Sequence, residues 1–255
     1  MKDKLILPHI KVAIIVFSSI LFLLFWDISS KITDQSIILP SVKETLTSLY
    51  KIISSGEFFS FIFTAFFRVF AGLFLGVSTG ILLAALCHRF DVVSTVISPI
   101  ISIMKATPVA CIIVLLWIRF NYTEIAVLVV LLMVMPVVWQ NVYDGLGATD
   151  KNMLEVASIF KLSKIQKIKV LYIPSVLSYL IPAVITSVGL AWKAEIAAEI
   201  MTYSNIGELI RDFKTVSFDT ASIFAWTIII VTFSILFEKS AKYLLGRLGN
   251  VLKAE

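Results

Sequence analysis

The sequence is poor in charged residues, histidine and cysteine, and the first shortage already excludes several classes of protein. Only 15% of the 255 residues are charged, against about 25% in soluble domains. Hydrophobic residues make up 59%, and the mean hydropathy is +0.97. A soluble core could not bury this much apolar surface, because a large part of any folded surface is already apolar. The composition excludes an ordinary soluble enzyme, a disordered chain and a disulfide-rich secreted module, and it indicates a membrane protein.

The few histidines and cysteines give no candidate metal or catalytic site. Neither His9 nor His88 has a His, Cys or Glu at i+3 or i+4, so a membrane-embedded metalloenzyme is disfavoured. Cys87 and Cys111 lie in or beside apolar runs, which favours buried thiols over a disulfide. No Gly-Lys pair occurs, so the chain carries no P-loop for ATP.

Six apolar runs are candidates for membrane spans, for which a helix needs about 20 residues. They lie at about 10–28, 66–86, 96–118, 124–142, 176–200 and 222–237. We therefore predict an all-α polytopic membrane protein in which residues 1–255 form a single transmembrane domain. No small-residue cleavage site follows the first run, which favours a retained helix over a signal peptide.

The basic residues are distributed unevenly between the two sides of these spans. Thirteen of the 22 lie in the two termini, the second-to-third loop and the fourth-to-fifth loop, and the last of these holds five. Six lie on the opposite side, and Arg68, Lys105 and Lys193 fall within or at the ends of spans. Since positive loops stay in the cytoplasm, we predict that both termini and the fourth-to-fifth loop are cytoplasmic.

Two segments outside the spans have the pattern of amphipathic helices. On the outer side, a capping box begins at Ser41 and Gly56 ends the stretch, which predicts either a helix on the outer leaflet or a solvated loop helix. The cytoplasmic loop 150–174 has an apolar face in its first half and a second capping box at Ser163. These patterns predict two short helices joined at about 161–163. We expect the two helices to dock either on a partner or on the protein's own helix ends.

The same loop carries the residues of a family resemblance. It reads Glu155-Val156-Ala157, then Lys161-Leu162-Ser163, then Leu171-Tyr172-Ile173-Pro174. This resembles the "EAA" loop of binding-protein-dependent ABC importer permeases, where Glu-Ala-Ala is first and Pro is twentieth. Further pieces look like the nitrate, sulfonate and taurine branch: Leu39-Pro40-Ser41, Arg68 with Gly72 and Gly76, Thr107-Pro108, Glu124, Asn141 with Gly145-Leu146, and Trp192 followed by Glu199.

Two positions depart from the family pattern. The family places Gly where this chain has Lys161, and its Gly-Leu-Gly after the fifth span is here Asn205-Ile206-Gly207. A lysine with positive φ costs about 1 kcal/mol or more, so we expect a different turn geometry at Lys161.

The resemblance implies a type I ABC importer permease fold in the inner membrane of a bacterium. The chain would not itself be an enzyme, and it would hold no cofactor, because a separate ATPase would bind ATP and Mg. The implied partners are two ATPase subunits, a second permease copy in a homodimer, an extracytoplasmic solute-binding protein and the lipid bilayer, with no nucleic acid. The implied coupling residues are Glu155, Val156, Ala157, Lys161, Ser163 and Pro174.

Polar residues within the spans mark a candidate translocation path, since such groups usually face protein or water. These are Arg68, Lys105 beside a helix break at Pro108, and Trp192, Lys193 and Glu199 on the fifth span. For Arg68, snorkelling to the outer interface is an equal alternative. Gly72, Gly76 and Gly80 recur every fourth residue, which indicates close helix packing.

Basic groups beside the path favour a small anion such as nitrate or a sulfonate, although this branch also carries compounds like thiamine precursors. The rival functions are a secondary transporter and a channel subunit, neither coupled to ATP. No clear internal duplication is visible, and six spans are few for a secondary transporter.

Overall fold

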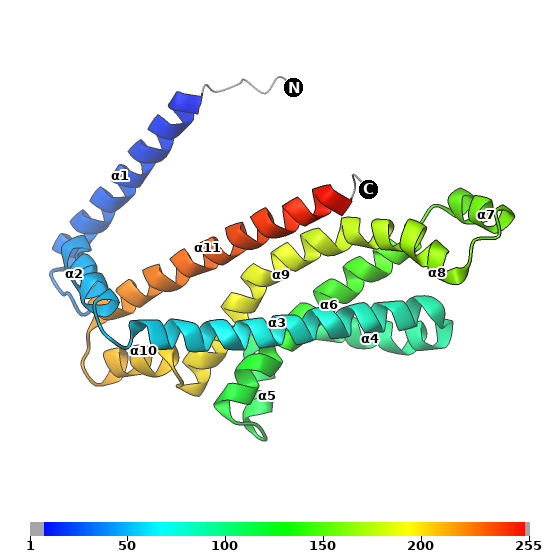
Figure 1. The fold of residues 1–255 in the computed structure, drawn as a ribbon. Coiled ribbons are helices and arrows are strands. Elements are labelled where there is room, and N and C mark those ends of the chain that lie inside the picture. Colours follow the sequence, from blue (N-terminus) through cyan, green and yellow to red (C-terminus); the bar gives the residue numbers. More distant parts are fainter. Residues whose placement is uncertain (1–7, 253–255) are drawn as a thin grey trace. The chain divides into compact units, whose positions relative to one another are not determined.

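The computed structural model describes the backbone of residues 8–252 and the side chains of residues 10 and 12–247. Helices make up most of this range and no strand occurs within it, which confirms the all-α prediction (Figure 1). Residues 1–7 and 253–255, with Lys2, Lys4 and Lys253 of the charge distribution, lie outside it. The elements are α1 (Pro8–Thr33), α2 (Val42–Ile53), α3 (Phe58–Arg89), α4 (Asp91–Ala106), α5 (Val109–Trp117), α6 (Tyr122–Gly147), α7 (Lys151–Ile159), α8 (Lys164–Lys167), the π-helical segment η1 (Ile168–Tyr172), α9 (Ile173–Thr202), α10 (Ile206–Thr215) and α11 (Thr220–Leu252).

Five helical segments of the described range are long and apolar enough to cross a membrane. They are 12–33, 58–89, 122–147, 164–202 and 220–247. The remaining expected span, 96–118, is not one straight helix: α4 and α5 pass the same test together, but their axes meet at 101°. Counting this pair as one span gives the predicted six. Thr107 and Pro108 are both extended there, and Pro108 is the N-cap of α5, because proline cannot continue the hydrogen-bonded helix before it.

By their contacts, the residues fall into two compact units. The first comprises 1–58 and 210–230, and the second comprises 59–209 and 231–255. In the first unit, Trp26 Nε1 of α1 donates to the Pro40 carbonyl at 2.9 Å, and its ring lies 5.5 Å from that of Phe224. These contacts fix the chain between α1 and α2.

The helix predicted after Ser41 is confirmed as α2 in the first unit, and its position on the outer leaflet stays a prediction. Ser41 is its N-cap, and both hydrogen bonds of the capping box with Glu44 are present. Hydrogen bonds from the Ser41 backbone N–H and hydroxyl lower the pKa of Glu44. Since a carboxylate at a helix start also interacts favourably with the helix dipole, the sequence determines this N-terminus locally.

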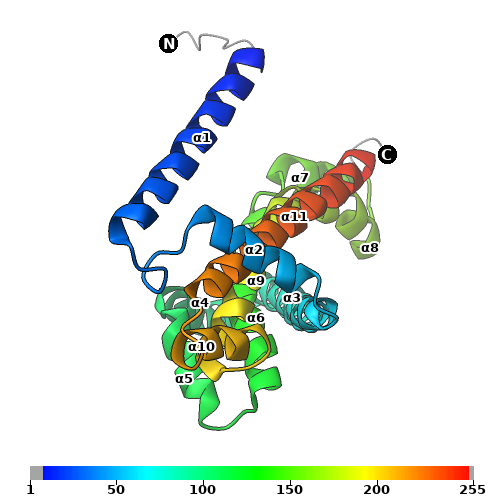
Figure 2. The same ribbon diagram turned by 90° about the vertical axis from the view of Figure 1, so that its left-hand side faces the viewer.

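The core of the second unit is the pair α6 and α9, which pack along each other. Both helices are apolar on most faces, and eleven residues of each are buried. Ser175 Oγ donates to the Gly145 carbonyl at 2.7 Å, which joins the start of α9 to the end of α6. Both views show α7 and α8 side by side (Figures 1 and 2), and Figure 1 shows them beyond the start of α9.

Candidate functional site

The predicted cytoplasmic loop folds into two short helices, α7 and α8, which we call the α7–α8 hairpin. Asp150 caps α7 by accepting a hydrogen bond from the Asn152 N–H at 2.8 Å. Ser163 caps α8 in a complete capping box with Gln166. The two-helix prediction and the position of the join are thereby confirmed.

The turn between these helices corrects the expectation for Lys161. Its φ is 53°, so the lysine adopts the left-handed conformation that the family's glycine would take. The Lys161 N–H donates to the Ser158 carbonyl at 3.0 Å, and the Leu162 N–H donates to the Ala157 carbonyl at 2.9 Å. These two bonds form a Schellman motif, which requires this conformation at its first residue after the cap. The expectation of a different turn geometry was wrong. The turn has the conformation expected for the family's glycine, although this conformation is strained for Lys161.

The α7–α8 hairpin exposes large apolar side chains. Ile159, Phe160 and Ile165 are 78%, 75% and 67% exposed, and Met153 and Val156 are exposed as well. Glu155 is also exposed, and no ion pair found among the described residues includes it. Ala157, by contrast, is buried. The motif positions therefore divide into an outward set around Glu155 and an inward packing position at Ala157.

The hairpin is braced internally and continues directly into a span. Lys167 Nζ on α8 donates to Ser158 Oγ on α7 at 2.8 Å. From Lys164, α8, η1 and α9 run as one 39-residue helix to Thr202, a length of about 58 Å at 1.5 Å per residue. Pro174 lies near the start of α9, where its missing N–H interrupts the ladder.

At the far end of α9, a cluster of polar side chains is buried within the second unit. Arg68 Nη1 on α3 lies 2.8 Å from Glu199 Oε1, and both side chains are less than a tenth exposed. Arg68 Nη2 lies 3.4 Å from Thr123 Oγ1, and its guanidinium lies 5.7 Å from the centre of the Tyr122 ring. Arg68 is therefore buried and paired, so it does not extend to the surface.

Residues just after α9 complete this cluster. Asn205 Nδ2 donates to Glu199 Oε1 at 2.8 Å and to the Phe61 carbonyl at 3.0 Å. The Ile206 N–H donates to Glu199 Oε2 at 3.2 Å. A Cβ on Gly207 would collide with the backbone oxygen of Glu199, so only glycine fits there. Sequence reasoning noted this tripeptide as a departure from the family pattern, but no sequence signal assigned it to Glu199.

The other residues of the candidate path do not gather at one place. Trp192 is fully buried, and its ring lies 5.0 Å from Phe237. Lys193, its neighbour, is exposed. Lys105 is exposed in the last turn of α4, directly before the break at Pro108. The structure thus buries Arg68, Glu199 and Trp192 and leaves the two lysines exposed.

The glycines of α3 lie against α6. A Cβ on Gly72, Gly76 or Gly80 would lie 2.5 Å, 2.9 Å and 2.9 Å from the Cβ atoms of Val130, Val134 and Val138, respectively. Each glycine therefore faces one valine at the same four-residue spacing, and no side chain fits between the two helices.

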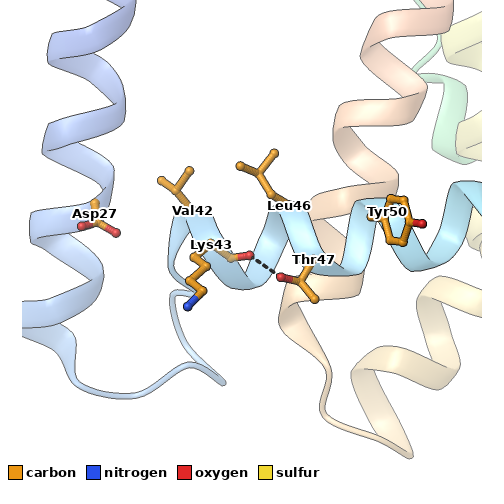
Figure 3. Close-up of a pocket in the computed structure, with 6 residues that line it drawn as sticks. All are labelled: Asp27, Val42, Lys43, Leu46, Thr47 and Tyr50. Carbon is orange, nitrogen blue, oxygen red and sulfur yellow. Dashed lines mark hydrogen bonds between the residues drawn. The ribbon is translucent and has the colours of Figure 1, made fainter.

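The first unit has an open cleft of its own between α1 and α2. Its lining residues are Asp27, Val42, Lys43, Leu46, Thr47 and Tyr50. Val42 and Leu46 point to one side of α2, while Lys43 and Thr47 lie on the other (Figure 3). The cleft is mostly apolar and brings no group of catalytic side chains together. Among the described residues, no three His, Cys, Asp or Glu side chains are placed to hold a metal ion.

Several known proteins are similar to this chain. Residues 72–250 match the family described as the binding-protein-dependent transport system inner membrane component. A putative aliphatic sulfonates transport permease protein of Bacillus subtilis is 25% identical over 75% of this chain and 70% of its own length. A formylaminopyrimidine transport permease protein of Halalkalibacterium halodurans is 26% identical over 91% of this chain and 92% of its own.

Two further similarities cover less of the chain. A nitrate import permease protein of Synechococcus elongatus is 27% identical over 61% of this chain and 56% of its own. The crystal structure of an amino acid ABC transporter with histidines shares the fold, with a TM-score of 0.60 and 16% identity. That match covers 74% of this chain and 90% of the other.

Proposed function

The chain belongs to the family of binding-protein-dependent transport system inner membrane components, and from this premise we propose that a separate ATPase drives it through the α7–α8 hairpin. As a permease of an ABC importer it is a transport component of a membrane. The proposal concerns the finer points: the coupling to ATP, the composition of the assembly, the membrane and the solute.

The exposed apolar surface of the α7–α8 hairpin carries the proposal. The two short helices expose the apolar side chains of Ile159, Phe160 and Ile165. Covering apolar surface with a partner is favourable by about 25 cal/mol for each Å² removed from water, so an exposed patch of this kind indicates a docking surface. The chain contains no Gly-Lys pair, so the ATP-binding chemistry has to come from another protein. An ATPase with a complementary groove would cover this face.

The continuous helix from α8 to α9 provides the route for movement. A displacement of α8 by a closing ATPase would shift α9 with it, because α8, η1 and α9 form one continuous helical segment. The other end of α9 carries Glu199, which binds α3 through Arg68. ATP-driven motion on the predicted cytoplasmic side would thus reach the opposite ends of the spans.

The assembly we propose is a homodimer with two ATPase subunits and an extracytoplasmic binding protein, in the inner membrane of a bacterium. The described residues of one copy provide up to six spans, and a two-sided path needs two halves. As a solute we propose a small anion, such as a sulfonate or nitrate. Lys105 supports this, since it is exposed beside the broken pair α4 and α5, where unwound backbone is typical of transport sites. A thiamine-precursor-like compound is the alternative solute.

The test is co-purification and ATP-dependent uptake with a Phe160→Glu variant. We expect the charged side chain to abolish ATPase binding and uptake while the permease still inserts and folds. Val216→Glu, which replaces an equally exposed apolar residue outside the hairpin, is the matched control and should leave both intact. Normal ATPase binding and uptake in Phe160→Glu would refute the docking proposal. Uptake without any ATPase would favour a secondary transporter or channel.

A further inference from the structure

Glu195 is a buried acid that the transport proposal does not use. It lies one turn before Glu199 on α9, and its side chain is fully buried. Neither of its carboxylate oxygens accepts a hydrogen bond from any donor among the described residues. An ionised carboxylate buried in this way would lose its hydration without compensation, which is strongly unfavourable.

The neighbour of Glu195 is a second carboxyl group, that of Glu199, and the two groups can form a hydrogen bond only if one of them is protonated. Glu195 and Glu199 are four residues apart on α9 and both are buried, so their side chains lie next to each other on one face of the helix. Two ionised carboxylates are both acceptors, so a hydrogen bond between them needs a proton on one. Glu199 already accepts from Arg68, Asn205 and the Ile206 N–H, an arrangement that suits a charged carboxylate.

The charges around Glu195 and Glu199 also favour a protonated Glu195. Arg68 contributes the one positive charge and Glu199 the one negative charge that balances it. The other groups that contact Arg68, the Thr123 hydroxyl and the Tyr122 ring, are neutral. A second negative charge on Glu195 would therefore have no counter-ion in the cluster.

We propose that Glu195 is a protonated carboxylic acid that donates a hydrogen bond to Glu199, so that the cluster is a binding site for one proton. With this proton the Arg68, Glu199 and Glu195 side chains are neutral as a group, and each has a partner. Without it, two carboxylates would compete for one guanidinium at the place where α3, α9 and the start of α10 meet. The inference does not depend on the identity of the solute or of the ATPase.

Infrared spectroscopy of the full-length permease in lipid tests the protonation directly. At neutral pH we expect the carbonyl band of a protonated carboxyl group, shifted in D₂O, and its loss in Glu195→Gln. Glu208→Gln, which removes an exposed carboxylate on α10, should keep the band. Absence of the band from the unmodified protein, or its persistence in Glu195→Gln, would overturn the proposal.

Thermal unfolding provides the second measurement. Glutamine at position 195 can donate to Glu199 as the protonated acid does, so Glu195→Gln should unfold near the temperature of the unmodified protein. Glu199→Gln removes the charge that Arg68 requires and should unfold at a clearly lower temperature. Failure of Glu195→Gln to fold would count against a protonated Glu195. An unfolding temperature that rises with sodium concentration would indicate a metal cation in place of the proton and would likewise overturn the proposal.

Discussion

Arg68 Nη1 lies 2.8 Å from Glu199 Oε1 and joins two helices whose residues are 131 positions apart in the sequence. The pair is buried, and the Asn205 side chain and the Ile206 N–H donate two further hydrogen bonds to the carboxylate. A buried ion pair of this kind contributes little beyond a well-packed apolar pair, but either charge left alone is costly. The ion pair therefore matters mainly because it fixes where α3, α9 and the segment after α9 meet.

Removing one member of this pair should destabilise the permease more than removing both. We expect Arg68→Met to lower the free energy of unfolding by roughly 3–5 kcal/mol, because Glu199 is left buried without its counter-ion. The double variant Arg68→Met with Glu199→Met should recover part of that loss. Denaturant unfolding of the purified protein measures both. A loss in the double variant equal to the sum of the losses in Arg68→Met and Glu199→Met alone would show that the charges do not interact in the folded protein.

Replacing Lys161 with glycine should make its turn more stable, because glycine adopts a positive φ without strain. With φ at 53°, Lys161 bears strain that glycine does not, so Lys161→Gly should stabilise the α7–α8 hairpin by roughly 1 kcal/mol. Hydrogen exchange of the hairpin amides measures this local stability. Lys164→Gly is the control: it lies in the regular first turn of α8, where glycine brings no gain and costs up to about 1 kcal/mol. Faster exchange in Lys161→Gly than in the unmodified chain would contradict the strain argument.

Local patterns in the sequence predicted local structure well. The capping boxes at Ser41 and Ser163 and the break at Pro108 depend on residues within four positions, and each begins or ends a helix as expected. The partner of Arg68 could not be predicted, because any polar residue of the other spans was an equal candidate. The 101° angle between α4 and α5 could not be predicted either, because the composition of a span indicates its length but not the direction of its two halves.

The turn at Lys161 shows why a local rule can fail. Propensity alone disfavours lysine with positive φ, yet the turn forms. Three further contributions act together there: two Schellman hydrogen bonds, the capping box at Ser163, and the bond from Lys167 to Ser158. Together they exceed a penalty of about 1–2 kcal/mol for one residue. The motif spacing, which sequence analysis recognised, was therefore a better guide than the residue at its centre.

Gly207 should tolerate no side chain. A Cβ there would collide with the backbone oxygen of Glu199, an atom that cannot rotate away. We expect Gly207→Ala to displace the Ile206 N–H from the Glu199 carboxylate and to lower the unfolding temperature. Gly147→Ala is the matched control, since no atom lies within 4 Å of the position its Cβ would take. Unchanged stability in Gly207→Ala would mean that the segment after α9 is free to shift.

The contact between α3 and α6 should depend on the absence of a side chain at Gly72. A Cβ at this position would lie 2.5 Å from Val130 Cβ and 2.8 Å from the Val127 backbone oxygen, so the helices would have to separate. Overpacking of this kind costs about 1–3 kcal/mol, and we expect Gly72→Ala to lower the free energy of unfolding by that amount. Gly246→Ala in α11 should act in the opposite direction, because nothing lies within 4 Å there and alanine favours a helix by up to about 1 kcal/mol. Both variants make the same chemical change inside a helix, so their difference isolates the close approach of α3 to α6. Equal effects of the two substitutions on denaturant unfolding would show that this approach is not required for stability.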